Sequence, residues 1–157
     1  MPTGEAPATS GVKFPPPLVY LGGLLAGWLL GGVQPLRAFD DAWADPACLV
    51  AMIAGATLVA SALGLFRRAG TDPLPMRPTT ALVLSGPYRF TRNPMYLGMA
   101  LIYLGFALLF DLTWALLLLP LVLLVIRTQV NAREERYLEA KFGEEYRAYR
   151  RRVRRWL

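Results

Sequence analysis

Long uncharged stretches alternate with short charged ones along this chain of 157 residues. Four stretches carry no Asp, Glu, Lys or Arg: 14–36, 46–66, 94–110 and 112–126. A helix needs about 20 apolar residues to cross a bilayer core, and the first two stretches meet this directly. The third does so if Arg92 and Asn93 lie at the interface, and the fourth if Arg127 extends toward the headgroups. The pattern predicts an all-α integral membrane protein with four transmembrane helices, at about 14–34, 47–66, 94–110 and 112–130.

A soluble protein with four buried core helices is the alternative interpretation of this pattern. Because the apolar residues are gathered in charge-free blocks, they are difficult to hide in a soluble domain of this size. We therefore favour the membrane protein. We expect residues 1–13 to form a short disordered tail and residues 14–157 to form a single membrane domain.

The distribution of charge predicts the orientation. The connection 34–46 has one arginine and three aspartates, whereas the connection 67–93 has five arginines and one aspartate. The chain from residue 127 onward has ten basic and five acidic residues. Because basic connections stay on the cytosolic side, both termini and the 67–93 loop are expected in the cytosol, in the inner membrane of a bacterium. The net charge of +6 then indicates contact with anionic lipid headgroups rather than with nucleic acid.

The segment 131–157 has the pattern of an amphipathic helix, which we expect on the cytosolic surface. Apolar or aromatic residues recur every three or four positions, at Leu138, Phe142, Tyr146, Tyr149, Val153 and Trp156. Gly143 is a candidate interruption. The six arginines between residues 147 and 155 are expected at the headgroups.

Two polar clusters are predicted to meet at the cytosolic end of the last two spans. Only a tight connection fits between these spans at 110–113, so they form an antiparallel hairpin. The stretch SGPYRFTRNPMYLG, which begins at Ser85, opens one arm, and Glu134 and Glu135 follow the other. The two glutamates are either part of a solvated charged surface or a carboxylate pair that binds hydroxyls or an ammonium group.

Local signals place the first of these clusters at a helix start. Gly86 and Pro87 indicate a turn, Asn93 is a good N-cap, and Pro94 suits the first helical turn. The exposed N–H groups at such a helix start favour an anion. Metal chemistry is not expected, because the chain has one cysteine and no histidine.

Together, the stretch from Ser85 and the later AREERYLEAKFGEEYRAY resemble the isoprenylcysteine carboxyl methyltransferase and phospholipid methyltransferase superfamily. The resemblance covers roughly 69–156. It implies an integral membrane methyltransferase that takes its methyl group from S-adenosylmethionine, with the cofactor bound at the cytosolic end of the hairpin. The acceptor implied is a lipophilic small molecule or a lipid that enters from the bilayer.

The resemblance also implies a set of site residues. Glu134 would bind the cofactor, and so would Leu82, Val83, Tyr88, Asn93, Pro94, Met95 and Tyr96. Arg92 is a candidate partner for the cofactor's carboxylate. We expect Glu135 and Arg133 to be catalytic, with Arg133 steering an acidic acceptor. Many members of the superfamily have histidine at the position of Asn93, and asparagine cannot titrate.

Three functions remain open at this point. The first is a methyltransferase that acts on a carboxylate, thiol or lipid amine. The second is an NADPH-dependent enzyme similar to sterol reductases, although the extra helices of those enzymes have no counterpart here. The third is a non-catalytic membrane protein with four helices that binds anionic lipid.

Overall fold

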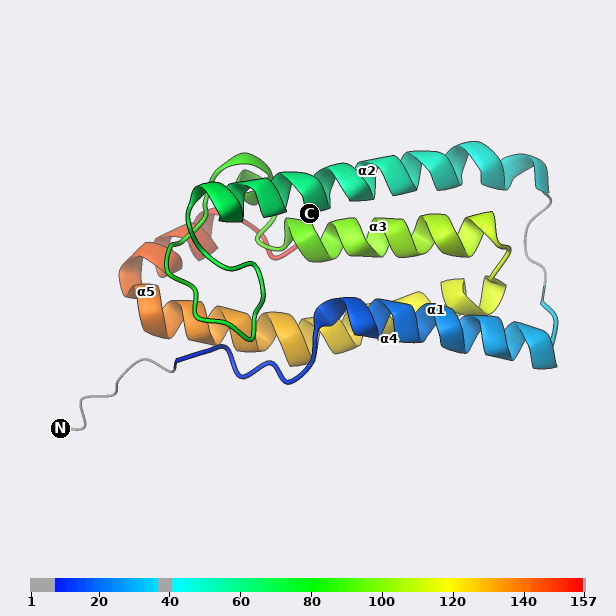
Figure 1. Ribbon diagram of the computed structural model, residues 1–157, viewed down its shortest axis with the longest axis horizontal. Helices are drawn as coiled ribbons and strands as arrows, with labels where there is room; N and C mark the ends of the chain where they lie inside the picture. Colours follow the sequence, from blue (N-terminus) through cyan, green and yellow to red (C-terminus); the bar gives the residue numbers. More distant parts are fainter. Residues whose placement is uncertain (1–7, 37–40, 157) are drawn as a thin grey trace.

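The computed structural model describes residues 8–36 and 41–156. Its elements over these residues are helices, and no strand occurs among them, which confirms the predicted all-α class. The helices are α1 (Pro16–Val33), α2 (Asp41–Arg68), the short 3₁₀ helix η1 (Gly86–Arg89), α3 (Pro94–Leu109), α4 (Thr113–Val125), the π-helical segment η2 (Ile126–Asn131) and α5 (Ala132–Arg152). In the long bundle that they form, α2 packs on α3 and α1 packs on α4 (Figure 1).

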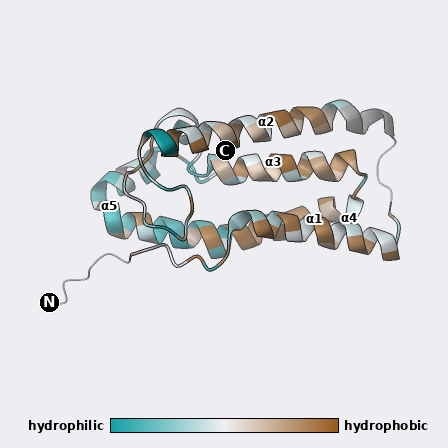
Figure 2. Ribbon diagram, in the orientation of Figure 1, coloured by the Kyte–Doolittle hydropathy of each residue, from teal (hydrophilic) through white to brown (hydrophobic). Residues whose placement is uncertain are grey.

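The bundle has the composition of a membrane protein. Three helices are long and apolar enough to cross a bilayer: Pro16–Val33, Pro46–Arg68 and the continuous helix Thr113–Arg152. Figure 2 shows that hydrophobic residues cover most of α1 to α4, whereas hydrophilic residues gather at the end with α5. The helix α3 has 16 residues, which is roughly 24 Å at 1.5 Å per residue. A fourth full span therefore stays a prediction, since a bilayer core is about 30 Å thick.

Glycine allows the helices to approach one another closely. A Cβ atom built on Gly98 of α3 would lie 2.7 Å from the carbonyl oxygen of Gly55 in α2. A Cβ atom built on Gly27 of α1 would lie 2.5 Å from the Cα atom of Ala115 in α4. Because atoms cannot approach this closely without displacement, only glycine fits at these two crossings.

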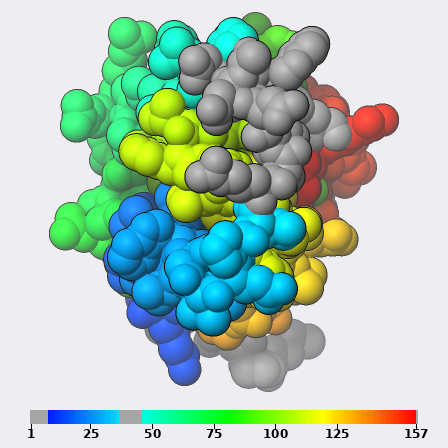
Figure 3. All heavy atoms as spheres, turned by 90° about the vertical axis from the view of Figure 1, so that its right-hand side faces the viewer, coloured from blue at the N-terminus to red at the C-terminus, as the bar shows by residue number. Residues whose placement is uncertain are grey.

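The helices α1 and α4 are also joined at the end of the bundle remote from α5. There the Trp114 indole N–H donates a hydrogen bond of 2.8 Å to the carbonyl of Gln34. Figure 3 looks onto this end and shows atoms of α1 next to those around the turn between α3 and α4. This turn is as tight as the hairpin prediction required, with Asp111 at a positive φ of 48°.

One helical path, α4–η2–α5, carries the chain from the apolar bundle into its charged end. Beyond Val130 the sequence becomes charged, so we treat the residues from Ala132 onward as lying outside the membrane-spanning part. The interruption predicted near Gly143 is confirmed: its φ of 53° and ψ of −123° break the helical geometry inside α5. The second half of α5 therefore bends back toward the start of α3 (Figure 1).

The helix expected over 131–157 ends earlier, at Arg152. At Val153 the backbone leaves the helix with extended dihedral angles, and the tail runs back beside the start of α3. The Arg92 N–H donates to the carbonyl of Arg154 at 2.9 Å. The helix ends early because the bend at Gly143 brings the tail to hydrogen-bond partners near α3, which replace a further helical turn.

The expectation of a disordered tail over residues 1–13 is wrong for residues 8–13, and residues 1–7 lie outside the described residues. Val12 is buried in the hydrophobic core. The Ser10 hydroxyl donates to the carbonyl of Pro75, and the Arg133 guanidinium donates to the carbonyl of Gly11 at 3.0 Å. Burial of an apolar side chain and these two hydrogen bonds hold this N-terminal segment against the 67–93 loop and α5.

Candidate active site

A direct contact joins the two polar clusters that the sequence predicted to meet. The Tyr96 hydroxyl, in the first turn of α3, donates a hydrogen bond of 2.9 Å to Glu134 Oε1, in the first turn of α5. The carbonyl of Tyr96 accepts a hydrogen bond of 2.9 Å from the Tyr20 hydroxyl of α1. Three helices that are distant in sequence are thus fixed at one point.

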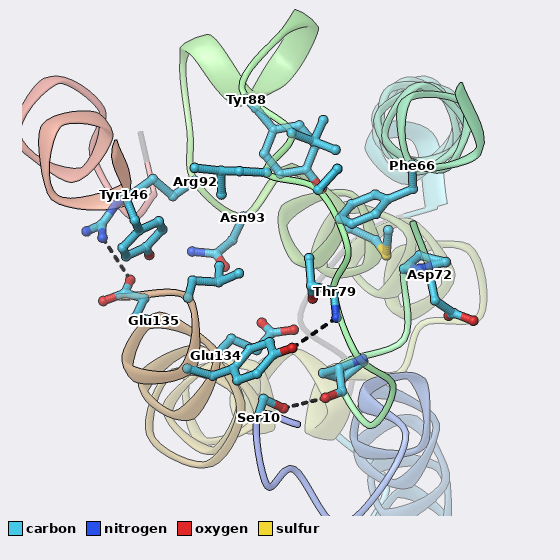
Figure 4. A pocket seen from close by; sticks show the side chains of 18 of the residues that line it. Ser10, Phe66, Asp72, Thr79, Tyr88, Arg92, Asn93, Glu134, Glu135 and Tyr146 are labelled. Atoms are coloured by element: carbon cyan, nitrogen blue, oxygen red, sulfur yellow. Dashed lines mark hydrogen bonds and ion pairs between the residues drawn. The ribbon is translucent and has the colours of Figure 1, made fainter. Parts of the chain in front are cut away.

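A pocket lies directly beside this contact, and both Tyr96 and Glu134 line it. Its cavity is small, about 90 Å³, and the space not filled by protein is about 800 Å³ when the part open to solvent is included. Figure 4 shows Tyr88 and Arg92 on one side of this space and Glu134 on the other. Nine residues predicted from the sequence line the pocket: Leu82, Val83, Tyr88, Arg92, Asn93, Met95, Tyr96, Glu134 and Glu135.

Glu134 presents a carboxylate without a cationic partner. Among the residues that the structure describes, no arginine or lysine lies within ion-pair distance of it, and its hydrogen bond comes from Tyr96. Burial raises the pKa of Glu134 to about 7; the Tyr96 hydroxyl lowers it and the nearby Glu135 charge raises it further. A buried carboxylate of this kind suits a ligand that brings an ammonium group or hydroxyls.

Glu135, by contrast, is held by two arginines. The Arg155 guanidinium donates to both of its oxygens, from Nε to Oε1 at 2.7 Å and from Nη2 to Oε2 at 2.6 Å. Arg92 Nη1 lies 3.1 Å from Oε1. The hydrogen bond with Glu135 also raises the pKa of Arg155. Adjacent glutamates therefore have different surroundings, one neutralised within the protein and the other facing the pocket.

Arg92 lies in the pocket wall with unused hydrogen-bonding capacity. Its side chain is 10% exposed, and neither Nε nor Nη1 has a hydrogen-bond acceptor among the described residues. Arg92 Nη1 therefore lies within ion-pair distance of Glu135 Oε1, but the two groups are not aligned for a hydrogen bond. Unpaired donors on a buried arginine are costly, so this side chain is suited to an anionic ligand.

Aromatic and apolar side chains form another part of the wall. The rings of Tyr88 and Phe66 meet edge to face, with centroids 5.9 Å apart, and the Tyr149 hydroxyl donates to the Tyr88 carbonyl at 2.7 Å. Burial, with contributions from the charge of Glu134 and from Tyr149, raises the pKa of Tyr88 well above its usual range. Tyr88 is therefore a neutral phenol in a mostly apolar wall, which suits a flat ring.

The loop between α2 and α3 closes the pocket on a further side. The Tyr137 hydroxyl of α5 accepts a hydrogen bond from the Thr79 N–H at 3.0 Å. The Ser10 contact with Pro75 adds the N-terminal segment to this wall (Figure 4). Few polar contacts hold this side, in keeping with a wall that can move when a ligand enters.

Two predicted site residues do not line the pocket. Pro94 is buried in the first turn of α3, where it supports the neighbouring Asn93 and Met95. The guanidinium of Arg133 contacts the carbonyl of Gly11 and, at 3.2 Å, Gln129 Oε1. Arg133 therefore joins the N-terminal segment to α5 in this structure.

Asn93 occupies the N-cap position of α3, but its side chain does not cap the helix. Instead its amide donates to the carbonyl of Arg155 at 3.0 Å. This contact, which the sequence did not predict, connects the position to the C-terminal tail.

Several lining residues were absent from the sequence prediction. Tyr137 and Leu138 could have been found, because they lie three and four positions after Glu134 on one helical face. Tyr146 and Tyr149 belong to the apolar and aromatic stripe that was predicted for the cytosolic helix, and the spacing did not indicate that they line a pocket. Nothing in the sequence distinguishes Phe66 from other residues of its apolar stretch.

Comparison with known proteins supports the motif resemblance. A family profile described as phospholipid methyltransferase matches residues 46–145, close to two thirds of the chain. The chain belongs to the phospholipid methyltransferase family. The region that matches this methyltransferase family includes most of α2, all of α3 and α4, and the part of α5 with both glutamates.

One similar protein carries no functional description. An uncharacterised protein of Haemophilus influenzae is 49% identical over 63 residues, which are 40% of this chain and 100% of that protein. No solved structure matches the chain. The family match is therefore the comparison that bears on function, and it identifies a membrane methyltransferase in general terms.

Proposed function

We propose that this protein is an S-adenosylmethionine-dependent methyltransferase that acts on a lipophilic acceptor in the membrane. The observation that carries the proposal is the Tyr96–Glu134 hydrogen bond of 2.9 Å, which joins the two family motifs at one pocket. Tyr88 and Glu134 line that same pocket, so one bound molecule can contact both.

The groups in the pocket fit the parts of S-adenosylmethionine. The unpaired carboxylate of Glu134 suits the ammonium group or the ribose hydroxyls. The unused donors of Arg92 suit the carboxylate. The apolar wall with Tyr88 and Phe66 suits the adenine ring. Opposite charges on facing walls match a zwitterionic ligand better than a purely anionic one.

Cofactor binding requires the pocket to widen. Ligand pockets for molecules of drug size are about 300–1,000 Å³, and this cavity has about 90 Å³. The side formed by the 67–93 loop and the N-terminal segment is held by few contacts, among them Ser10 with Pro75 and Thr79 with Tyr137. We propose that this side moves when the cofactor enters.

The protein's contribution to methyl transfer is orientation. When bound, S-adenosylmethionine supplies a methyl group that is already activated by its sulfonium. Holding two reactants in line can contribute up to about 7–11 kcal/mol to the lowering of a barrier. Arg92, Glu134 and the aromatic wall, which lie on different elements, hold the donor in place and exclude water.

The acceptor decides whether a base is needed. A carboxylate or thiolate is already deprotonated, whereas a lipid amine must lose a proton. The chain has no histidine, and Tyr88 is a neutral phenol. Glu134 has a pKa of about 7, but its carboxylate is assigned to the cofactor, so an acceptor that arrives deprotonated suits this pocket best. Glu135 we assign to positioning, because both of its oxygens are engaged by arginine.

We propose that the acceptor reaches the pocket from the bilayer, on the side where Phe66 ends the apolar part of α2 and Met95 lies in the first turn of α3. The family name supports a lipid. The steering role of Arg133, the contact of the basic C-terminal half of α5 with anionic headgroups, and the location of both termini in the cytosol of a bacterium remain predictions.

One experiment tests the proposed activity and identifies the acceptor class. Membranes that contain the protein are incubated with methyl-labelled S-adenosylmethionine, and label is followed into lipid, protein and volatile fractions. We expect label in the lipid fraction with the wild type and none with Glu134→Ala at equal protein level. Equal label in both samples, or saturable binding of NADPH without binding of S-adenosylmethionine, would contradict the proposal.

A further inference from the structure

The cluster around Glu135 contains more positive than negative charge. Two arginines, Arg92 and Arg155, contact this carboxylate, and Glu134 is directed to Tyr96 instead. The contacts are unequal, because Arg155 makes a bidentate pair at 2.6 and 2.7 Å whereas Arg92 approaches to 3.1 Å without hydrogen-bond alignment. Bidentate arginine–carboxylate pairs are the strong ones. Glu135 is therefore neutralised mainly by Arg155, and the charge of Arg92 is left over.

The C-terminal tail also holds the backbone around Arg92. The Arg92 N–H donates to the carbonyl of Arg154 at 2.9 Å. The carbonyl of Arg155 accepts from the Thr91 hydroxyl and from the Asn93 amide, each at 3.0 Å. Three consecutive residues before α3 are thus fixed by the tail, which limits the directions that the Arg92 side chain can take.

We infer that Arg155 is a positioning residue of the cofactor site: because it neutralises Glu135, the positive charge of the nearby Arg92 guanidinium is available to the carboxylate of the cofactor. The inference rests on the proposed function, which supplies the identity of the ligand. Without Arg155, Glu135 and Arg92 form a neutral pair, and the pocket loses the positive charge that selects a carboxylate. With Arg155 present, the buried Arg92 keeps a net positive charge beside the pocket, and its Nε and Nη1 have no aligned hydrogen-bond acceptor among the described residues.

The test compares two ligands that differ only in the carboxylate. Equilibrium binding of S-adenosylmethionine and of decarboxylated S-adenosylmethionine is measured by calorimetry on the full chain in detergent. For the wild type we expect S-adenosylmethionine to bind roughly tenfold or more tightly, since a charge-assisted pair is lost with the other ligand. In Arg155→Ala the ratio of the two affinities, S-adenosylmethionine over its decarboxylated form, should fall toward one. Arg154→Ala is the matched control: its side chain is exposed and its backbone carbonyl remains, so the ratio should not change.

A double variant distinguishes charge competition from simple loss of structure. In Glu135→Gln/Arg155→Ala, Arg92 has no carboxylate to pair with, so the ratio between the two ligands should return toward the wild-type value. A damaged fold would not be rescued in this way. Arg155→Lys keeps the charge but loses the bidentate geometry, so its ratio of affinities should lie between those of the wild type and Arg155→Ala. This variant replaces Arg155→Ala in the test if Arg155→Ala does not fold.

The outcomes separate the inference from the proposed function. If the wild type binds neither ligand, the proposed function fails and the inference with it. If the wild type prefers S-adenosylmethionine and Arg155→Ala keeps the full preference, only the inference is overturned. The same conclusion follows if the double variant has the low ratio of Arg155→Ala.

Discussion

The Tyr96 hydroxyl and Glu134 Oε1 lie 2.9 Å apart, although the two residues are 38 positions apart in the sequence. Each belongs to the first turn of a helix, α3 for Tyr96 and α5 for Glu134. The contact therefore reports the geometry on which the account depends, because it exists only if both helix starts are at the same end of the bundle. The contact also fixes the direction of the Glu134 carboxylate in the pocket.

Loss of the Tyr96 hydroxyl should lower the affinity for S-adenosylmethionine more than it lowers the stability of the protein. In Tyr96→Phe the ring remains and Glu134 loses its donor, so we expect the affinity for S-adenosylmethionine to fall roughly tenfold, as for one hydrogen bond to a charged group. Calorimetry measures this. Tyr103→Phe is the control, because its hydroxyl donates to the Ala115 carbonyl at 2.7 Å within the bundle. It should lower stability and leave the affinity unchanged; an equal loss of affinity in both variants would argue against the assignment.

Cofactor binding should depend on pH through Glu134. Its pKa of about 7 means that the carboxylate, the form that attracts an ammonium group or accepts from hydroxyls, is lost as the pH falls below 7. We expect the affinity for S-adenosylmethionine to decrease by up to about tenfold per pH unit below that value. In Glu134→Gln the binding should be weak at every pH between 5 and 8. A wild-type affinity that is constant over this range would contradict the role of Glu134.

The close crossing of α2 and α3 should tolerate no side chain at Gly98. A Cβ atom there would meet the Gly55 carbonyl at 2.7 Å, so Gly98→Ala should cost about 1–3 kcal/mol of stability through overpacking. Gly64 in α2 has no neighbouring atom within 4 Å of a built Cβ, and Gly64→Ala should be neutral or slightly stabilising because alanine favours the helix. Thermal unfolding in detergent measures both. Equal midpoints for the two variants would show that the crossing is looser than described.

Asn131 is expected to limit the stability of the protein. It ends the π-helical segment η2, is fully buried, and neither its side-chain oxygen nor its nitrogen has a partner among the described residues. A buried unsatisfied polar group costs about 1–3 kcal/mol. Asn131→Leu should therefore raise the midpoint of thermal unfolding, whereas Asn131→Asp should lower it. A lower midpoint in Asn131→Leu would mean that the amide has a stabilising partner.

The sequence was sufficient for the parts of the site that depend on chain connectivity. The apolar blocks around 94–110 and 112–126 require a hairpin, and a hairpin places the residues before the first block beside those after the second. Family resemblance then selected Tyr88, Tyr96 and Glu134 from these two segments. All three line one pocket, although their roles toward a cofactor remain to be measured.

The sequence was insufficient where a side chain's partner depends on a bend. The positive φ of Gly143 directs the end of α5 toward α3, and neither the size of this bend nor its direction can be read from the spacing of apolar residues. Arg155 was for this reason grouped with the arginines expected at lipid headgroups, whereas it contacts Glu135. Val12 was likewise assigned to a disordered tail because a single apolar residue among polar ones gives no periodic signal.

Equilibrium binding of S-adenosylmethionine to the purified full chain, in detergent or lipid discs, tests the role of Glu134 in the cofactor site most directly. Glu134→Ala is compared with Glu145→Ala, a change of the same type at an exposed position of α5. We expect saturable binding by the wild type and by Glu145→Ala, and loss of binding in Glu134→Ala with an unchanged unfolding midpoint. Equal affinity in all three proteins, or no binding by the wild type, would contradict that role.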